Sequence, residues 1–178
     1  MDSSTTHLVG VAIPTLRELR SAVLSAADAG AAVTALREAG FAGGDAIHAA
    51  FEQWLTESQS VDARTSAADL PLDKFGDNAA RFFRDAGWGE VVFSEDEADG
   101  VAIVDITNCW EGGSDSSGSS PGCHVTTGLL ASFFGKIAGY PVAVLETECC
   151  SGSGERCRFL MGNADVMNYK WAELSGTP

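Results

Sequence analysis

Two pairs of strand-like segments, separated by one helical segment, are the feature that most restricts the fold of this chain. The first pair spans 88–93 and 100–108, short runs rich in aromatic and β-branched residues with an acidic turn between them. The second pair spans 141–147 and 156–161, with a Gly-Ser-Gly turn at 152–154. Because each pair reverses direction through a turn, the strands pair antiparallel and cannot form a parallel βαβ sheet. The sequence therefore predicts an α+β fold, with N-terminal helices packed on a four-stranded antiparallel sheet.

Apolar residues recur every three or four positions in the remaining helical segments. These segments are 16–27, 31–39, 46–55, 72–86 and 125–138. Pro14 suits the start of the first, and Gly40 is predicted to end the second. Asp45 is predicted to cap the third, which makes 31–39 and 46–55 two separate helices. The fifth has a wide apolar face and ends at Gly139.

The chain is expected to form one folding domain over 15–162. An N-terminal arm over 1–14 precedes it, and a tail over 163–178 follows it, with a short helix around Trp171 as one interpretation. Polar, Ser/Thr-rich composition predicts a loop over 56–69, and the run from Gly112 to Gly122 is predicted to be a flexible loop.

Charge and hydropathy restrict the classes of function. The net charge of −14 over 178 residues opposes binding to a phosphate backbone, so direct nucleic-acid binding is not expected. No apolar run approaches the roughly 18 residues of a membrane span. The N-terminus has no basic region followed by an apolar core, so it is not predicted to be a secretory signal. We therefore expect a cytoplasmic protein.

Four of the five cysteines lie in one stretch, from Cys123 to Cys157. An odd number of cysteines in a cytoplasmic chain favours metal ligands or buried thiols over disulfides. A hairpin turn would bring Cys149 near Cys157, and the helix after Cys123 would return the chain to Glu146. Three thiolates and one carboxylate form a closed tetrahedral set for a structural zinc ion. Spacing alone favours this zinc site no more than buried free thiols, which pack as small hydrophobic side chains.

Three residues are alternative ligands, since each is able to replace one member of this set. They are His124, Cys150 and Glu148, which strand alternation places on the same face as Glu146. Cys109 lies outside the stretch and is interpreted as a buried thiol, and Cys150 as a second thiol that does not bind the ion unless it replaces a ligand.

The arrangement resembles the 4-vinyl reductase domain family. The four residues of the ligand set follow Trp110-Glu111 and a Gly-rich loop, with Gly128 and Gly139 near the helix ends. The resemblance covers roughly Leu16 to Met161. The family includes the sensory domains of phenol- and toluene-responsive bacterial transcription activators, stand-alone hydrocarbon-binding proteins and a protein encoded with bacteriochlorophyll synthesis. Its fold is similar to small trafficking-complex subunits with a buried lipid tunnel.

The resemblance implies a structural zinc ion held by Cys123, Glu146, Cys149 and Cys157. It also implies a buried pocket beside the zinc for a small aromatic molecule, with Trp110 as the pocket tryptophan and its indole N–H as a donor. The other residues expected to line this pocket are Phe75, Phe82, Thr127, Phe133 and Val144. Family sensors carry tyrosines and a histidine where this chain has Thr127, Phe133 and Phe82, so the ligand is expected to be more apolar than phenol. Members of the family dimerise, which implies a homodimer.

These features favour a zinc-stabilised domain that binds a small hydrophobic or aromatic molecule and serves a sensory or regulatory role. The alternative is an accessory or reductase-associated factor in chlorophyll or other tetrapyrrole synthesis, as the family name suggests. An enzyme is less favoured, because the sequence has no Gly-x-Gly-x-x-Gly after a strand, no phosphate-binding loop and no paired nucleophile and base.

Overall fold

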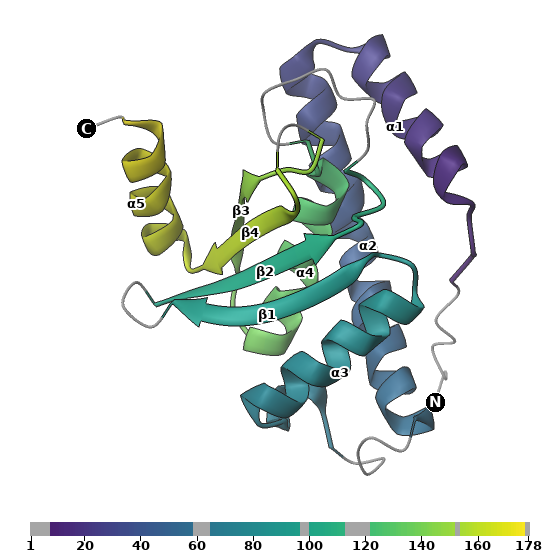
Figure 1. The fold of residues 1–178 in the computed structure, drawn as a ribbon, viewed down its shortest axis with the longest axis vertical. Helices are drawn as coiled ribbons and strands as arrows, with labels where there is room; N and C mark the ends of the chain where they lie inside the picture. Colours follow the sequence, from purple (N-terminus) through teal and green to yellow (C-terminus); the bar gives the residue numbers. More distant parts are fainter. Residues whose placement is uncertain (1–7, 59–64, 97–99, 113–121, 152–153, 177–178) are drawn as a thin grey trace.

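The computed structural model describes residues 8–58, 65–96, 100–112, 122–151 and 154–176, and every structural statement below concerns these residues. The chain forms helices and strands in the following order (Figure 1): α1 (Ile13–Ala26), α2 (Ala29–Glu57), the 3-10 helix η1 (Ala67–Asp69), α3 (Leu72–Asp85), β1 (Glu90–Asp96), β2 (Val101–Thr107), α4 (His124–Ala138), β3 (Ala143–Glu148), β4 (Cys157–Gly162) and α5 (Ala164–Ser175). No helix in this described part of the chain is long and apolar enough to cross a membrane.

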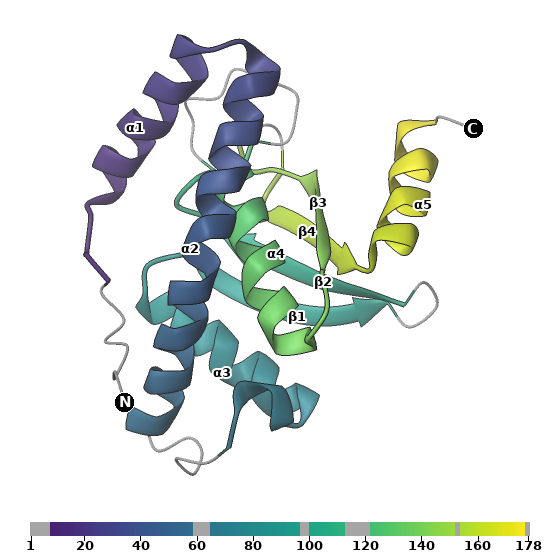
Figure 2. The same ribbon diagram turned by 180° about the vertical axis from the view of Figure 1, so that it is seen from behind.

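The four strands form one antiparallel sheet in the order β1-β2-β4-β3, which confirms the predicted α+β fold. Each predicted hairpin supplies two neighbouring strands, and the pairing of β2 with β4 joins the hairpins, with Val104 opposite Phe159. Both side chains are fully buried beneath the helices. Helix α4 lies over one face of the sheet, and α2 runs along the outer side of α4 (Figure 2), so α2 belongs to a second helical layer.

Helix α2 is one continuous helix of 29 residues, so the prediction of two helices separated near Gly40 was wrong. Asp28 caps it, with its carboxylate accepting hydrogen bonds from the N–H groups of Gly30 and Ala31 at 3.1 Å. Asp45, the predicted cap, lies inside the helix. Glycines in the middle of a helix lower its intrinsic stability, and here packing against α4 outweighs that preference.

The glycines of α2 face α4 and allow the two helices to approach closely. A Cβ atom built at Gly40 would collide with the backbone carbonyl of Val125 on α4. The reverse contact is equally tight, since a Cβ at Gly128 of α4 would collide with the carbonyl of Arg37 and lie 2.9 Å from the nitrogen of Phe41. These glycines are therefore packing positions and not helix ends.

We expect Gly128→Ala to destabilise the protein by about 2 kcal/mol or more, because rigid backbone of α2 occupies the space that the new methyl group needs. Urea unfolding followed by circular dichroism measures this change. Gly135→Ala in the same helix is the matched control, since its Cβ would meet nothing closer than 3.5 Å. The control is expected to be neutral or more stable by up to about 1 kcal/mol. Equal stability of the two variants would contradict the close-packing interpretation.

Several segment ends differ from the sequence prediction. Helix α1 begins at Ile13, inside the predicted arm 1–14, and α5 occupies most of the predicted tail 163–178. The predicted loop 56–69 contains the end of α2 and the whole of η1, whose Ala67 is buried. Most of the predicted Gly112–Gly122 loop lies outside the described residues, as do 1–7, 59–64, 97–99, 152–153 and 177–178.

Candidate functional site

The structure brings the four predicted metal-ligating residues together at one end of the sheet. Cys123 immediately precedes α4, Glu146 lies on β3, Cys149 follows that strand, and Cys157 begins β4. One ligand atom from each residue lies within 4.8 Å of the others, so the group is able to hold a metal ion. The sulfur atoms of Cys123 and Cys157 are 3.4 Å apart, and Cys149 lies 3.8 Å from Cys123 and 3.9 Å from Cys157.

The carboxylate of Glu146 is held in place by one oxygen and free at the other. Its Oε2 accepts a hydrogen bond from the backbone N–H of Cys123 at 2.9 Å. Its Oε1 is buried and has no hydrogen-bond partner among the described residues. Burial and the neighbouring Cys149 sulfur raise the pKa of Glu146 to about 8. A buried carboxylate oxygen without a donor is costly, and a cation at this position would remove the cost.

The thiols of the cluster perturb one another. The pKa values of Cys109 and Cys149 are lowered, mainly because the neighbouring Cys123 thiol donates to each sulfur. The pKa values of Cys123 and Cys157 are raised, chiefly through their hydrogen bonds with Cys109. Burial is the main cause of a raised pKa at Cys150. All five thiols therefore titrate as one coupled group.

Cys109 and Cys150 lie in the same cluster, which spacing alone did not predict. The sulfur of Cys109 is 3.9 Å from that of Cys123, and the sulfur of Cys150 is 3.3 Å from that of Cys157. Gly112 packs directly against these atoms, because a Cβ built there would collide with Cys150 and lie 2.9 Å from the Cys157 sulfur.

Glu148 does not share the orientation of Glu146, so the prediction that it lies on the same strand face was wrong. The register of β3 against β4 shifts between the two residues, with Glu146 opposite Phe159 and Glu148 opposite Arg158. Such an irregularity reverses the alternation of side chains. Glu148 instead forms an ion pair with Arg156 at 3.3 Å.

His124 follows Cys123 but is not a member of the four-residue group. Its Nδ1 atom is buried without a hydrogen-bond partner in the described part of the chain. Burial, followed by the charges of Arg37 and Arg20, lowers the pKa of His124 to about 4. The imidazole is therefore neutral at pH 7.

Glu111 holds the start of α4, a role that sequence reasoning missed. Its buried carboxylate accepts hydrogen bonds from the N–H groups of Val125 and Thr126 at 2.9 and 2.8 Å, and from the Thr126 hydroxyl at 2.9 Å. It also lies 3.3 Å from the guanidinium of Arg20 on α1. Burial raises the pKa of Glu111, while the three donors oppose the shift. The first N–H groups of a helix have no partner within it, and Glu111 supplies one from another part of the chain.

Helix α1, all of which the structure describes, has no buried residue and is attached to this site by two arginines. Arg17 donates a hydrogen bond to the backbone carbonyl of Trp110 at 2.8 Å, and Arg20 donates one to that of Gly122 at 2.6 Å. The ends of the segment between β2 and α4 are thus both bound to α1.

The side chains predicted to surround a small pocket beside the metal pack closely in the interior. The rings of Phe82 and Phe133 lie 5.2 and 5.6 Å from that of Phe51. The Thr127 hydroxyl donates to the backbone carbonyl of Cys123 at 2.7 Å. Trp110 is buried with its ring edge-on to Trp88, and its indole N–H has no partner among the described residues.

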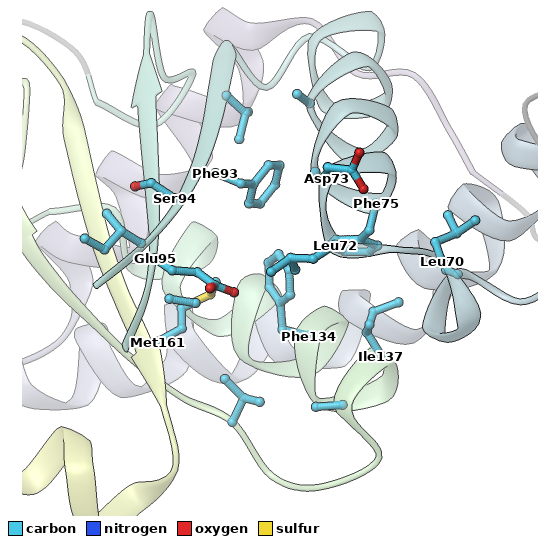
Figure 3. A pocket seen from close by; sticks show the side chains of 18 of the residues that line it. Leu70, Leu72, Asp73, Phe75, Phe93, Ser94, Glu95, Phe134, Ile137 and Met161 are labelled. Carbon is cyan, nitrogen blue, oxygen red and sulfur yellow. The ribbon is translucent and has the colours of Figure 1, made fainter. Parts of the chain in front are cut away.

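A cavity of about 1030 Å³ opens further along the same face of the sheet, between α3, β1 and the C-terminal half of α4. Figure 3 shows Phe75, Phe93, Phe134, Ile137 and Met161 around it. Phe75 belongs to the predicted pocket set, and the other five members of that set do not line this cavity. Val144 lies next to it, since it pairs with Met161 across β3 and β4.

The polar part of this cavity is acidic. Of the described residues that line it, Asp73, Asp77 and Glu95 are acidic and none is basic. Figure 3 shows the Glu95 side chain extending from β1 across the cavity. Its mouth is formed partly by exposed apolar side chains, including Leu72 and Tyr140. The lining thus combines an apolar interior with a negatively charged rim.

Strand β4 connects the cavity with the metal-ligating cluster. Cys157, Phe159 and Met161 are alternate residues and all are buried, so they point to the same face of the sheet. Cys157 belongs to the cluster and Met161 lines the cavity. Four residues of a strand separate them by about 13 Å.

Comparison with known proteins places this arrangement among characterised folds. Residues 102–163, which run from β2 through β4, match the 4-vinyl reductase domain. The chain is similar in structure to the phenol-responsive sensory domain of the transcription activator PoxR, solved with phenol, with a TM-score of 0.63 and 16% identity over 96% of this chain and 84% of that chain. A vinyl-4-reductase family protein from Methanocaldococcus jannaschii is also similar, with a TM-score of 0.53 and 15% identity over 88% of this chain and 83% of that chain.

Comparison of the sequence with curated proteins gave no match. The structural likenesses are at low identity and show a shared fold, whereas the domain match is a match of sequence and includes all four members of the metal-ligating group. The chain therefore carries a 4-vinyl reductase domain over residues 102–163 and has the fold of such domains, which confirms the resemblance that its residues indicated.

Proposed function

We propose that this chain is a zinc-stabilised sensory or regulatory domain that binds a hydrophobic or aromatic small molecule. The observation that carries the proposal is the apolar cavity, which shares one face of the sheet with the metal-ligating cluster. A volume of about 1030 Å³ is that of a small-molecule site. The similar PoxR domain is described as phenol-responsive, which supports a ligand-binding role for this fold. A homodimer and a cytoplasmic location complete the proposal.

Zinc fits the four-residue group by donor chemistry and by spacing. Zn–S bonds of about 2.3 Å in a tetrahedron place neighbouring sulfur atoms about 3.8 Å apart. The three sulfur–sulfur distances here are 3.4, 3.8 and 3.9 Å. Three thiolates and Glu146 leave no open position, so the ion would stabilise the fold and not react with substrate. The four residues would join the start of α4 to the β3–β4 hairpin.

We place the ligand in the cavity lined by Phe75, and not beside Trp110. Phe82 and Phe133 are already packed against Phe51, and they form a second layer of rings behind the cavity wall. Thr127 has its hydroxyl engaged by the Cys123 carbonyl. In this proposal Trp110 and Thr127 support the metal end of the domain, and Val144 backs Met161.

The acidic rim gives the proposed ligand a charge preference. Carboxylates of Asp73, Asp77 and Glu95 repel an anion and attract a cation, and the rings of Phe75 and Phe93 favour an apolar or cationic group. We therefore propose a neutral or cationic apolar molecule, and not a carboxylate or phenolate.

Isothermal titration with octan-1-ol, octyltrimethylammonium and octanoate, all below their micellar concentrations, tests this function. The first two are expected to bind, the cation about fivefold more tightly than the alcohol, since a rim ion pair contributes up to about 1 kcal/mol. Octanoate is expected to bind at least about fivefold more weakly than the alcohol, by the same charge argument. Ala80→Trp, which fills the cavity, should abolish binding, because Ala80 lines it.

Ala164→Trp on the exposed start of α5 is the matched control and should bind as the unchanged protein does. Absence of binding by all three compounds would contradict the ligand-binding function. Equal binding of all three would refute only the charge preference. Unchanged binding by Ala80→Trp would place the ligand elsewhere.

A further inference from the structure

The cluster contains more sulfur than one zinc ion coordinates. A four-coordinate ion bound by Cys123, Glu146, Cys149 and Cys157 leaves Cys109 and Cys150 as additional thiols. Neither is remote from the group, because their sulfur atoms lie 3.9 Å from Cys123 and 3.3 Å from Cys157. All five cysteines are free of disulfides. Every cysteine of the chain thus contributes to one cluster.

The two additional thiols contact the same pair of sulfur atoms. Cys109 is hydrogen-bonded to the sulfur atoms of both Cys123 and Cys157, and Cys150 contacts Cys157. Cys123 and Cys157 therefore lie in two groups of donors, with Glu146 and Cys149 in one group and the additional thiols in the other. The spacings of 3.3 and 3.9 Å resemble the edge of about 3.8 Å expected for a zinc–thiolate tetrahedron.

We propose that the cluster holds two metal ions, the second bound by Cys109, Cys150 and the bridging thiolates of Cys123 and Cys157. The ion it would take is zinc or another soft divalent ion that prefers thiolates. The second position goes beyond the single structural zinc of the proposed function and is independent of the ligand cavity.

The backbone around the additional thiols has the features of a ligand-supporting shell. The N–H groups of Glu111 and Gly112 both form hydrogen bonds with the Cys109 sulfur. The N–H of Cys150 donates to the Cys157 sulfur at 3.5 Å. Bonds of this kind stabilise thiolates and orient metal ligands.

Gly112 shows that the turn after β2 is folded directly onto the sulfur atoms. No larger residue fits, since a Cβ there would collide with Cys150 and approach the Cys157 sulfur to 2.9 Å. The turn from Cys109 to Gly112 thereby places its own thiol and two N–H groups at the cluster. A cysteine that was only filling space in the core would not need backbone donors aimed at its sulfur.

A different explanation is that Cys109 and Cys150 stay protonated and donate S–H hydrogen bonds to the thiolates of a single ion. Serine distinguishes the two cases, because its hydroxyl keeps the donor but is a poor ligand for a soft metal. The double variant Cys109→Ser/Cys150→Ser keeps all four donors of the first ion.

The test is the number of zinc ions held by the full chain after refolding with excess Zn²⁺ and removal of unbound metal. Elemental analysis and native mass spectrometry should give two ions per chain for the unchanged protein and one for the double variant. Cadmium-113 NMR of the unchanged protein should show two coupled resonances, one from a four-sulfur position, and the double variant should show one.

One ion in both proteins would overturn the second position and leave the single structural zinc intact. Two ions in both would also overturn it, because the additional thiols would then not be ligands. No ion in either protein would contradict the structural zinc as well. The ligand titrations described above do not depend on any of these outcomes.

Discussion

Replacing Cys157 with serine is expected to remove the bound metal and to lower the free energy of unfolding by about 5 kcal/mol, or ~10–20 °C in the unfolding midpoint. Cys157 is fully buried at the start of β4, and its sulfur lies 3.4, 3.9 and 3.3 Å from those of Cys123, Cys149 and Cys150. Serine is similar in size but is a poor zinc ligand. Because structural zinc contributes binding energy directly to folding, its loss removes much of a typical domain's stability.

Metal content by elemental analysis and thermal unfolding by circular dichroism measure the two effects together. Cys150→Ser is the matched control, since it changes the adjacent thiol and keeps all four donors of the first ion. It is expected to retain at least one ion and most of the stability. A Cys157→Ser protein with unchanged metal content and midpoint would refute the central role of this cluster in the fold.

Replacing Glu111 with alanine is expected to cost about 3–5 kcal/mol in the free energy of unfolding. The substitution leaves the N–H groups of Val125 and Thr126 without their acceptor and leaves Arg20 without its partner. All of these groups lie at the start of α4, next to Cys123. We therefore also expect weaker zinc binding, measured by competition with a chromogenic chelator.

Denaturant unfolding of the zinc-loaded protein gives the stability change. Glu90→Ala is the matched control, because Glu90 is exposed and its contact with Arg84 is long, at 3.8 Å. The control should change stability by no more than about 0.5 kcal/mol. A similarly small effect of Glu111→Ala would show that other groups hold the start of α4.

The elements of the fold were predictable where local pattern decides them. The change from helical spacing to short β-branched runs identified both hairpins, and the structure pairs them in one antiparallel sheet. The end of α4 was also predicted, since Gly139 adopts the left-handed conformation with φ of 72° that glycine favours. Local pattern failed at α2, where the glycines near residue 40 indicated helix ends but serve close packing against α4.

The candidate site divides in the same way. The four residues of the metal-ligating group could be chosen from spacing, because a hairpin and a returning helix bring near neighbours in sequence together. Glu148 could not be assigned correctly, since one irregularity in the pairing of β3 reverses its direction. Cys109 and Glu111 could not be assigned either, because their contacts are with residues at least 14 positions away.

By itself the sequence determined the types of element, the antiparallel sheet and the group of three cysteines and one glutamate. These follow from periodicity and from turns, which act between residues close along the chain. Only the tertiary structure decided that α2 is continuous, that all five thiols form one cluster, and that the cavity lies beside Phe75 and not beside Trp110. Those features depend on how tightly distant helices and side chains pack, since the rings of Phe51, Phe82 and Phe133 occupy the interior and leave open space only at its edge.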